Sequence, residues 1–83
     1  MTAWLLCRLD TGMFSDEAAV TYPAHAVKWQ KSVFVPRTFV RTEGEHSGRV
    51  RVEVLVKDGT QYAVLPSSQR DIVKVDVAAD LQQ

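Results

Sequence analysis

This sequence has one cysteine, few glycines and no net charge, and each of these features excludes a class of protein. The one cysteine, Cys7, cannot form a disulfide within the chain and is typical of a reducing compartment. Ten basic and ten acidic residues give a formal net charge of zero, which excludes a generally basic protein. The four glycines form no phosphate-binding loop. No segment approaches the roughly 18 consecutive apolar residues of a membrane-spanning helix, so we expect no membrane partner.

The N-terminal segment is apolar from Trp4 to Cys7 but lacks the features of a secretory signal. No basic residue precedes this stretch, and Arg8 and Asp10 interrupt it early. We therefore expect a cytoplasmic protein. With 83 residues, 46% of them hydrophobic and 24% charged, the chain has a globular composition and the length of a single domain, residues 1–83.

Valine is abundant, and its placement predicts β-structure. β-branched side chains pack well on a pleated sheet, and valine here alternates with other residues over a long segment. This period of two predicts a strand with one buried and one solvated face. Four valines are expected to point into the core: Val50, Val52, Val54 and Val56. Three charged residues of the same strand are expected to face solvent: Arg49, Arg51 and Glu53.

A β-hairpin is predicted directly after this strand. Asp58 and Gly59 separate it from residues 60–65, which have strand composition again. Asp-Gly between two strands favours a tight turn because both residues tolerate positive φ.

Other short strands are expected along the chain, separated by turn residues. They are residues 4–9, 18–22, 27–35 and 72–77, and residues 39–42 are either a short strand or the end of a turn that begins at Pro36. Helix has little support. Residues 77–83 are expected to form a frayed turn or a loose tail.

About six short strands with minimal helix predict an all-β fold, a small antiparallel β-barrel. Such a barrel leaves few exposed edges, and no helix is available to cover an open sheet. The segment from Ala63 through Pro66 to Ser68, followed by a strand from Ile72 to Val75, is similar to the last part of SH3-like barrels. This resemblance implies an SH3-like or related architecture. It implies no ligand, because the acidic and aromatic residues that receive proline-rich peptides are not in the sequence.

The residues that could support catalysis stand apart from one another. Cys7 lies in an apolar strand without a catalytic signature around it, which favours a structural role. His25 and His46 each lie alone in a predicted loop and lack the spacing of a zinc site. We expect no catalytic residues, no metal and no cofactor, and therefore no enzyme.

The middle of the chain departs from the neutral composition. Residues 18–42 contain four basic residues and no acidic residue: Lys28, Lys31, Arg37 and Arg41. Three aromatic residues lie among them: Trp29, Phe34 and Phe39. Bases interleaved with aromatic rings are the ingredients of a nucleic-acid surface. The alternative interpretation is an ordinary barrel wall, and the zero net charge favours it because few counterions would be released on binding.

Two large apolar residues, Met13 and Phe14, follow a turn glycine in the loop of residues 10–16. Exposed apolar groups beside polar ones tend to mark contact sites, so this loop and that of residues 43–48 are a candidate functional surface. The alternative is that Phe14 plugs one end of the barrel.

These observations favour a small non-catalytic binding module whose ligand is a protein or a second copy of the chain. Seven residues form its candidate contact surface: Met13, Phe14, Lys28, Trp29, Lys31, Arg37 and Arg41. The alternative hypothesis is a nucleic-acid-associated barrel that uses residues 28–41. A third is an accessory subunit with a site shared across an oligomer.

Overall fold

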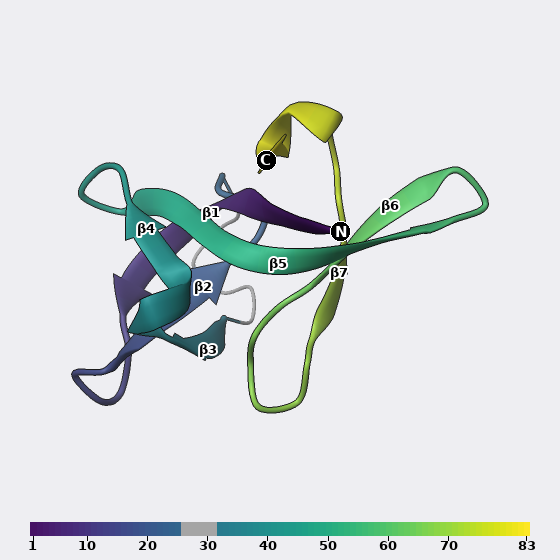
Figure 1. Cartoon of the computed structure of the whole chain (residues 1–83). Coiled ribbons are helices and arrows are strands. Elements are labelled where there is room, and N and C mark those ends of the chain that lie inside the picture. The colour runs from purple at the N-terminus through teal and green to yellow at the C-terminus, as the bar shows by residue number, and fades with distance from the viewer. Residues whose placement is uncertain (26–31) are drawn as a thin grey trace.

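The computed structural model describes residues 1–25 and 32–83, and the fold is all-β (Figure 1). In these residues one antiparallel sheet curls into a half-barrel of six main strands, which confirms the predicted fold class. The strands are β1 (Thr2–Thr11), β2 (Glu17–Thr21), β3 (Val33–Pro36), β4 (Val40–Thr42), β5 (Ser47–Lys57), β6 (Thr60–Val64), β7 (Ile72–Lys74) and β8 (Leu81–Gln82). Two short 3-10 turns, η1 (Arg37–Phe39) and η2 (Ala78–Asp80), precede β4 and β8.

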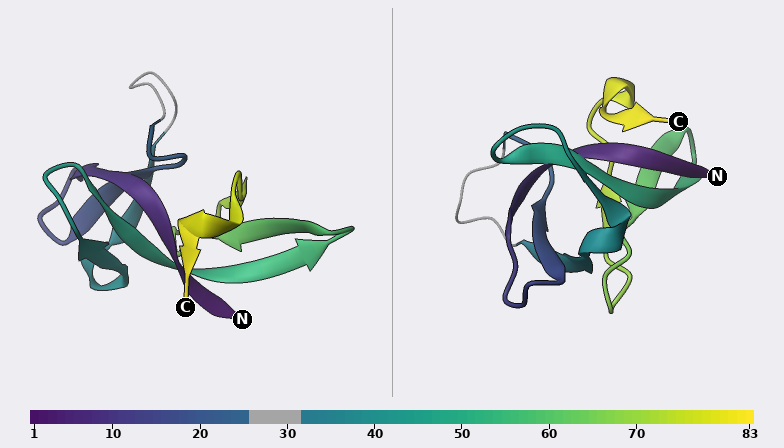
Figure 2. Two further views of the ribbon diagram at one scale, coloured as in Figure 1. Left: turned by 90° about the horizontal axis from the view of Figure 1, so that it is seen from above. Right: turned by 60° about the vertical axis from the view of Figure 1, so that its left-hand side comes forward.

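The long strands β1 and β5 form the centre of the sheet. The strand order is β3-β2-β1-β5-β6-β7, with β4 also paired to β5 and β8 also paired to β1. Figure 2 shows the curl of the sheet and the β5–β6 hairpin, which extends away from the other strands. Each long strand therefore contacts several partners along its length.

The core lies on the inner face of the curled sheet. Alternate residues of the two central strands are buried in it: Ala3, Leu5, Cys7, Leu9, Val50, Val52 and Val54. Alternate residues of β1 and β5 thus face the core, and the residues between them face away from it, as the period of two predicts. Val56 is an exception. It lies on the inner side of the strand but is exposed, because the hairpin has already passed the end of the core.

The predicted hairpin is confirmed. Lys57 pairs with Thr60, and the two residues between them have φ of 53° at Asp58 and 77° at Gly59. Positive φ at both positions matches the right-handed twist of the flanking strands.

The described part of the predicted strand 27–35 is β3, which ends at Pro36 as expected, and residues 27–31 lie outside the described residues. Both alternatives for residues 39–42 are realised, because η1 follows Pro36 and leads directly into β4.

The segment that is similar to SH3-like barrels forms β6, a turn and β7, as that resemblance implies. Ser67 Oγ closes the turn by accepting a hydrogen bond from Asp71 N at 3.0 Å.

The C-terminal segment is anchored to the sheet, so the expectation of a loose tail is wrong. Leu81 and Gln82 of β8 pair with β1. Tyr22 OH donates a hydrogen bond to Asp80 Oδ2 at 2.6 Å and accepts one from Asp76 N at 2.8 Å. These partners lie far from one another in sequence, which is why local composition did not reveal them.

Candidate functional site

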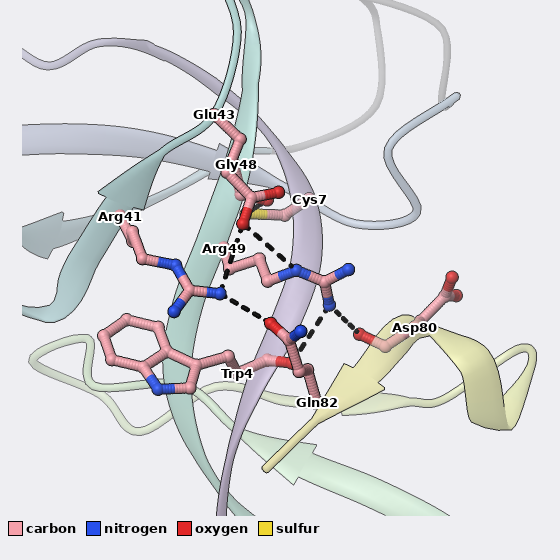
Figure 3. Close-up of polar contacts among 8 residues, drawn as sticks. All are labelled: Trp4, Cys7, Arg41, Glu43, Gly48, Arg49, Asp80 and Gln82. Atoms are coloured by element: carbon pink, nitrogen blue, oxygen red, sulfur yellow. Dashed lines mark hydrogen bonds and ion pairs between the residues drawn. The ribbon is translucent and has the colours of Figure 1, made fainter.

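Arg41 takes part in a polar cluster that joins β8 to the sheet (Figure 3). Its Nη2 donates to Gln82 Oε1 at 2.6 Å and lies 3.2 Å from Glu43 Oε2. Its guanidinium carbon lies 4.9 Å from the centroid of the Trp4 ring, a cation–π contact. One of the predicted contact residues thus has its charge matched within the protein.

Arg49 belongs to the same cluster, and the prediction that it faces solvent is wrong. Its side chain is only 15% exposed, with Nε 3.4 Å from Glu43 Oε2. Nη1 donates to the carbonyl oxygen of Asp80 at 3.2 Å and to that of Trp4 at 3.5 Å (Figure 3). The C-terminal turn η2 covers this position, which strand alternation alone places on the outer face.

Arg37 holds the loop that contains Met13 and Phe14. Its Nε donates to Ser15 O at 2.9 Å, and its backbone N–H donates to Asp16 O at 2.8 Å. Met13 is 77% exposed and Phe14 is 63% exposed. Phe14 therefore does not plug the end of the barrel, and the loop presents both side chains to solvent.

The predicted basic and aromatic surface is only partly within the described residues. Lys28, Trp29 and Lys31 lie outside them. Phe34 and Phe39 are both exposed. The two described bases of this surface are Arg37 and Arg41, and they bond to different partners. Each is bonded to a different loop or strand.

A cleft of about 490 Å³ lies beside β5, between η1 and the turn that follows β6. Sequence analysis did not identify it. Phe39 lies on one wall, and Val64, Pro66 and Ser67 lie on another. The walls come from η1 and from the turn after β6, which lie far apart in the sequence and meet beside β5. No local sequence motif therefore marks the cleft.

One edge of β5 has no strand partner at residues 51–52, which line this cleft. Val54 N–H donates to Met1 O at 2.7 Å, so even-numbered residues of β5 turn their backbone groups toward β1 and odd-numbered ones toward the opposite edge. On that edge Arg49 pairs with β4 and Glu53 pairs with β6. Arg51 lies between the two partners. Its N–H faces the carbonyl oxygen of Phe39, as the pairing of Val40 with Val50 requires, and its C=O points into the gap.

Two arginines give the cleft a positive charge. Arg51 and Arg70 both line it, against one carboxylate, Glu53. Neither guanidinium lies within ion-pair distance of a carboxylate in residues 1–25 and 32–83. A ligand with an acidic group and a flat apolar group would match both the arginines and the Phe39 ring.

Cys7 has the properties of a core residue. It is fully buried, and its thiol donates weakly to Gly48 O at 3.8 Å. Burial raises the pKa of Cys7 to about 12, so the thiol is protonated at neutral pH. A pocket that exposes Cys7 beside a histidine would favour the hypothesis of a shared site, but the Cys7 side chain is fully buried. His46 lies instead 3.2 Å from Asp10, and His25 is exposed.

Alkaline pH is expected to destabilise the fold through Cys7 and Tyr22. Burial raises the pKa of Cys7 from 9.0, and burial with the hydrogen bond to Asp80 raises that of Tyr22 from 10.0, both to about 12. A pKa raised in the folded state contributes stability below the ordinary pKa and loses it as pH rises toward the folded value. Urea unfolding between about pH 8 and 12 should therefore show a steeper loss in the native sequence than in Cys7→Ala/Tyr22→Phe. Parallel pH profiles would contradict this assignment.

Comparisons with protein-family models, curated proteins and solved structures found no match to this chain. No helix in the described ranges is long and apolar enough to cross a membrane. Within the same residues, no three His, Cys, Asp or Glu side chains are grouped as metal ligands.

Proposed function

We propose that the protein is a small binding module that holds an extended, acidic peptide segment in the cleft beside β5. The observation that carries the proposal is the break in strand pairing at Arg51. An extended segment can donate a hydrogen bond to the Arg51 C=O there, in the manner of peptides that add to a sheet edge. Since one residue offers only a short ladder, side chains must supply most of the affinity.

The side chains of the cleft favour acidic ligands with apolar neighbours. In an extended peptide, alternate side chains point in opposite directions, so acidic and apolar groups can alternate along it. The acidic groups would meet Arg51 and Arg70, and the apolar groups would pack against Phe39 and Pro66. Charge-assisted hydrogen bonds of this kind each contribute about 1.5–3 kcal/mol.

Nucleic acid is the alternative ligand, and the described basic residues support it less. Arg37 and Arg41 already bond to Ser15, Glu43 and Gln82. The acidic group in the cleft, Glu53, would repel a phosphate backbone, whereas a peptide can present a polar group to it.

Fluorescence anisotropy with three labelled probes tests the proposal. The probes are a short peptide that alternates glutamate with valine, its lysine–valine counterpart and a single-stranded oligonucleotide. We expect the acidic peptide to bind best, and Arg51→Glu to weaken its binding about tenfold or more. The matched control is Lys57→Glu, which makes the same charge change on β5 outside the cleft.

Two outcomes would contradict the proposal. Equal or tighter binding of the oligonucleotide would favour the nucleic-acid hypothesis. Equal losses in Arg51→Glu and Lys57→Glu would show that net charge, and not the cleft, determines binding.

A further inference from the structure

Arg70 has a backbone conformation that its residue type disfavours. Its φ is 52°, in the left-handed region, where a Cβ lies too close to the following carbonyl oxygen. Glycine adopts this region without that cost, and asparagine and aspartate adopt it more readily than other residues. Among the described residues, the other non-glycine residue with positive φ is Asp58, which belongs to the tight turn of the β5–β6 hairpin. Turn chemistry therefore explains Asp58 but not Arg70.

The turn between β6 and β7 holds Arg70 in this conformation. Arg70 N–H donates to Ser67 O at 3.0 Å, and Asp71 N–H donates to Ser67 Oγ at 3.0 Å. The Ser67 hydroxyl donates to Asp71 Oδ2 at 2.6 Å, and Leu65 N–H donates to Asp71 O at 2.8 Å. Unfavourable backbone conformations persist only where the surrounding structure fixes them, and they cluster at active sites and ligand-binding segments. The strain at Arg70 therefore points to a use for its side chain.

The Arg70 side chain lies where the proposed ligand would contact it. Arg70 and Arg51 both line the cleft beside β5, and neither forms an ion pair with a carboxylate of the described residues. The neighbouring Asp71 carboxylate already accepts the bond from Ser67, and the cleft itself contains one carboxylate, Glu53. A guanidinium in this position can form a bidentate pair with a carboxylate of the ligand.

We propose that Arg70 is the specificity-determining residue of the cleft. Its guanidinium pairs with an acidic side chain of the bound segment and sets the preference for acidic over neutral peptides. This role rests on the peptide-binding function proposed above. Glycine at position 70 would relieve the strain, so the native arginine lowers the stability of the turn and provides a charge in the cleft. Arg51 differs, because it lies in an extended strand and its charge carries no such cost.

Arg70→Gly tests both effects of the arginine in one variant. The melting temperature should rise by about 4 °C, because glycine adopts the left-handed conformation without strain. Fluorescence anisotropy should be measured with the glutamate–valine peptide and with a glutamine–valine peptide of the same length. The ratio of the two affinities should fall about tenfold in the variant, because the charge-assisted pair with Arg70 is lost. A residue with a merely structural role would not change this ratio.

Two control variants isolate the cleft from the turn conformation and from net charge. Asp58→Gly places glycine at the other positive φ, in a hairpin turn outside the cleft. Lys57→Gln removes a positive charge from β5 outside the cleft. Both variants should keep the affinity ratio of the native sequence.

The outcomes separate this role from the proposed function. Equal binding of the two peptides to the native sequence would contradict the proposed function and this role together. A native preference for the acidic peptide that is lost in Arg51→Glu but kept in Arg70→Gly would overturn the role of Arg70 alone. An equal fall of the ratio in Lys57→Gln, or a lower melting temperature in Arg70→Gly, would also overturn it.

Discussion

Val54→Asp is expected to unfold the protein at room temperature. Val54 is 6% exposed and belongs to the core cluster of β1 and β5, where a carboxylate would have no partner. Burying an unpaired charge costs at least about 4 kcal/mol, a large part of the stability of a domain of this size. Thermal melting followed by circular dichroism should show no cooperative transition in this variant.

The control for Val54→Asp is Val56→Asp. Val56 lies two residues further on the same side of β5 but is 64% exposed. Its substitution should change the free energy of unfolding by about 0.5 kcal/mol or less, because the new carboxylate stays in water. If both variants were equally destabilised, the core would extend to the end of the hairpin and the described packing would be wrong.

Gly48→Ala is expected to produce the second large loss of stability. A Cβ at this position would meet Arg41 O and Leu9 Cδ1 at less than contact distance, with Thr42 Cα 3.1 Å away. The carbonyl oxygen cannot move without disturbing the pairing of β4 with β5. We expect a cost of about 3 kcal/mol, at the upper end for overpacked sites, measurable by urea unfolding.

Gly44→Ala is the matched control for this substitution. A Cβ there would meet Ser47 Oγ at 2.6 Å, and a serine side chain can rotate away. Neither Gly44 nor Gly48 has positive φ, so backbone strain does not confuse the comparison. Gly44→Ala should stay within about 1 kcal/mol of the native sequence. A harmless Gly48→Ala would show that Arg41 and Leu9 lie further from Gly48 than the structure places them.

The elements that sequence predicted best are those whose cause is local. Asp58 and Gly59 form the predicted turn because the residues themselves tolerate positive φ. Val50, Val52 and Val54 are buried because alternation on a pleated strand leaves one face for the core. These outcomes need no knowledge of distant residues.

The errors arise where a distant segment decides the outcome. A period of two predicts which face of β5 each side chain occupies. It does not predict that the core ends before Val56, or that η2 covers Arg49. The C-terminal segment is ordered because Tyr22 bonds to Asp80 and β1 pairs with β8.

The candidate site escaped sequence analysis for the same reason. Arg51 resembles any other base on a solvated strand face, and it lines a cleft only because β4 ends before it and β6 begins after it. Of the residues that were predicted as contacts, Met13 and Phe14 are exposed, and Arg41 is bonded to Gln82.

The central position of β1 has a consequence for how quickly the chain reaches this structure. β1 pairs with β2, β5 and β8, so residue 2 must find residue 53 and residue 4 must find residue 82. The β5–β6 hairpin closes over two residues and can form within about 1–10 μs. Pairings between distant segments must first overcome the entropy of closing long loops, and proteins dominated by them fold in about milliseconds to seconds. We therefore expect the hairpin arm to form before the rest of the sheet, and the docking of β1 onto β5 to set the folding rate.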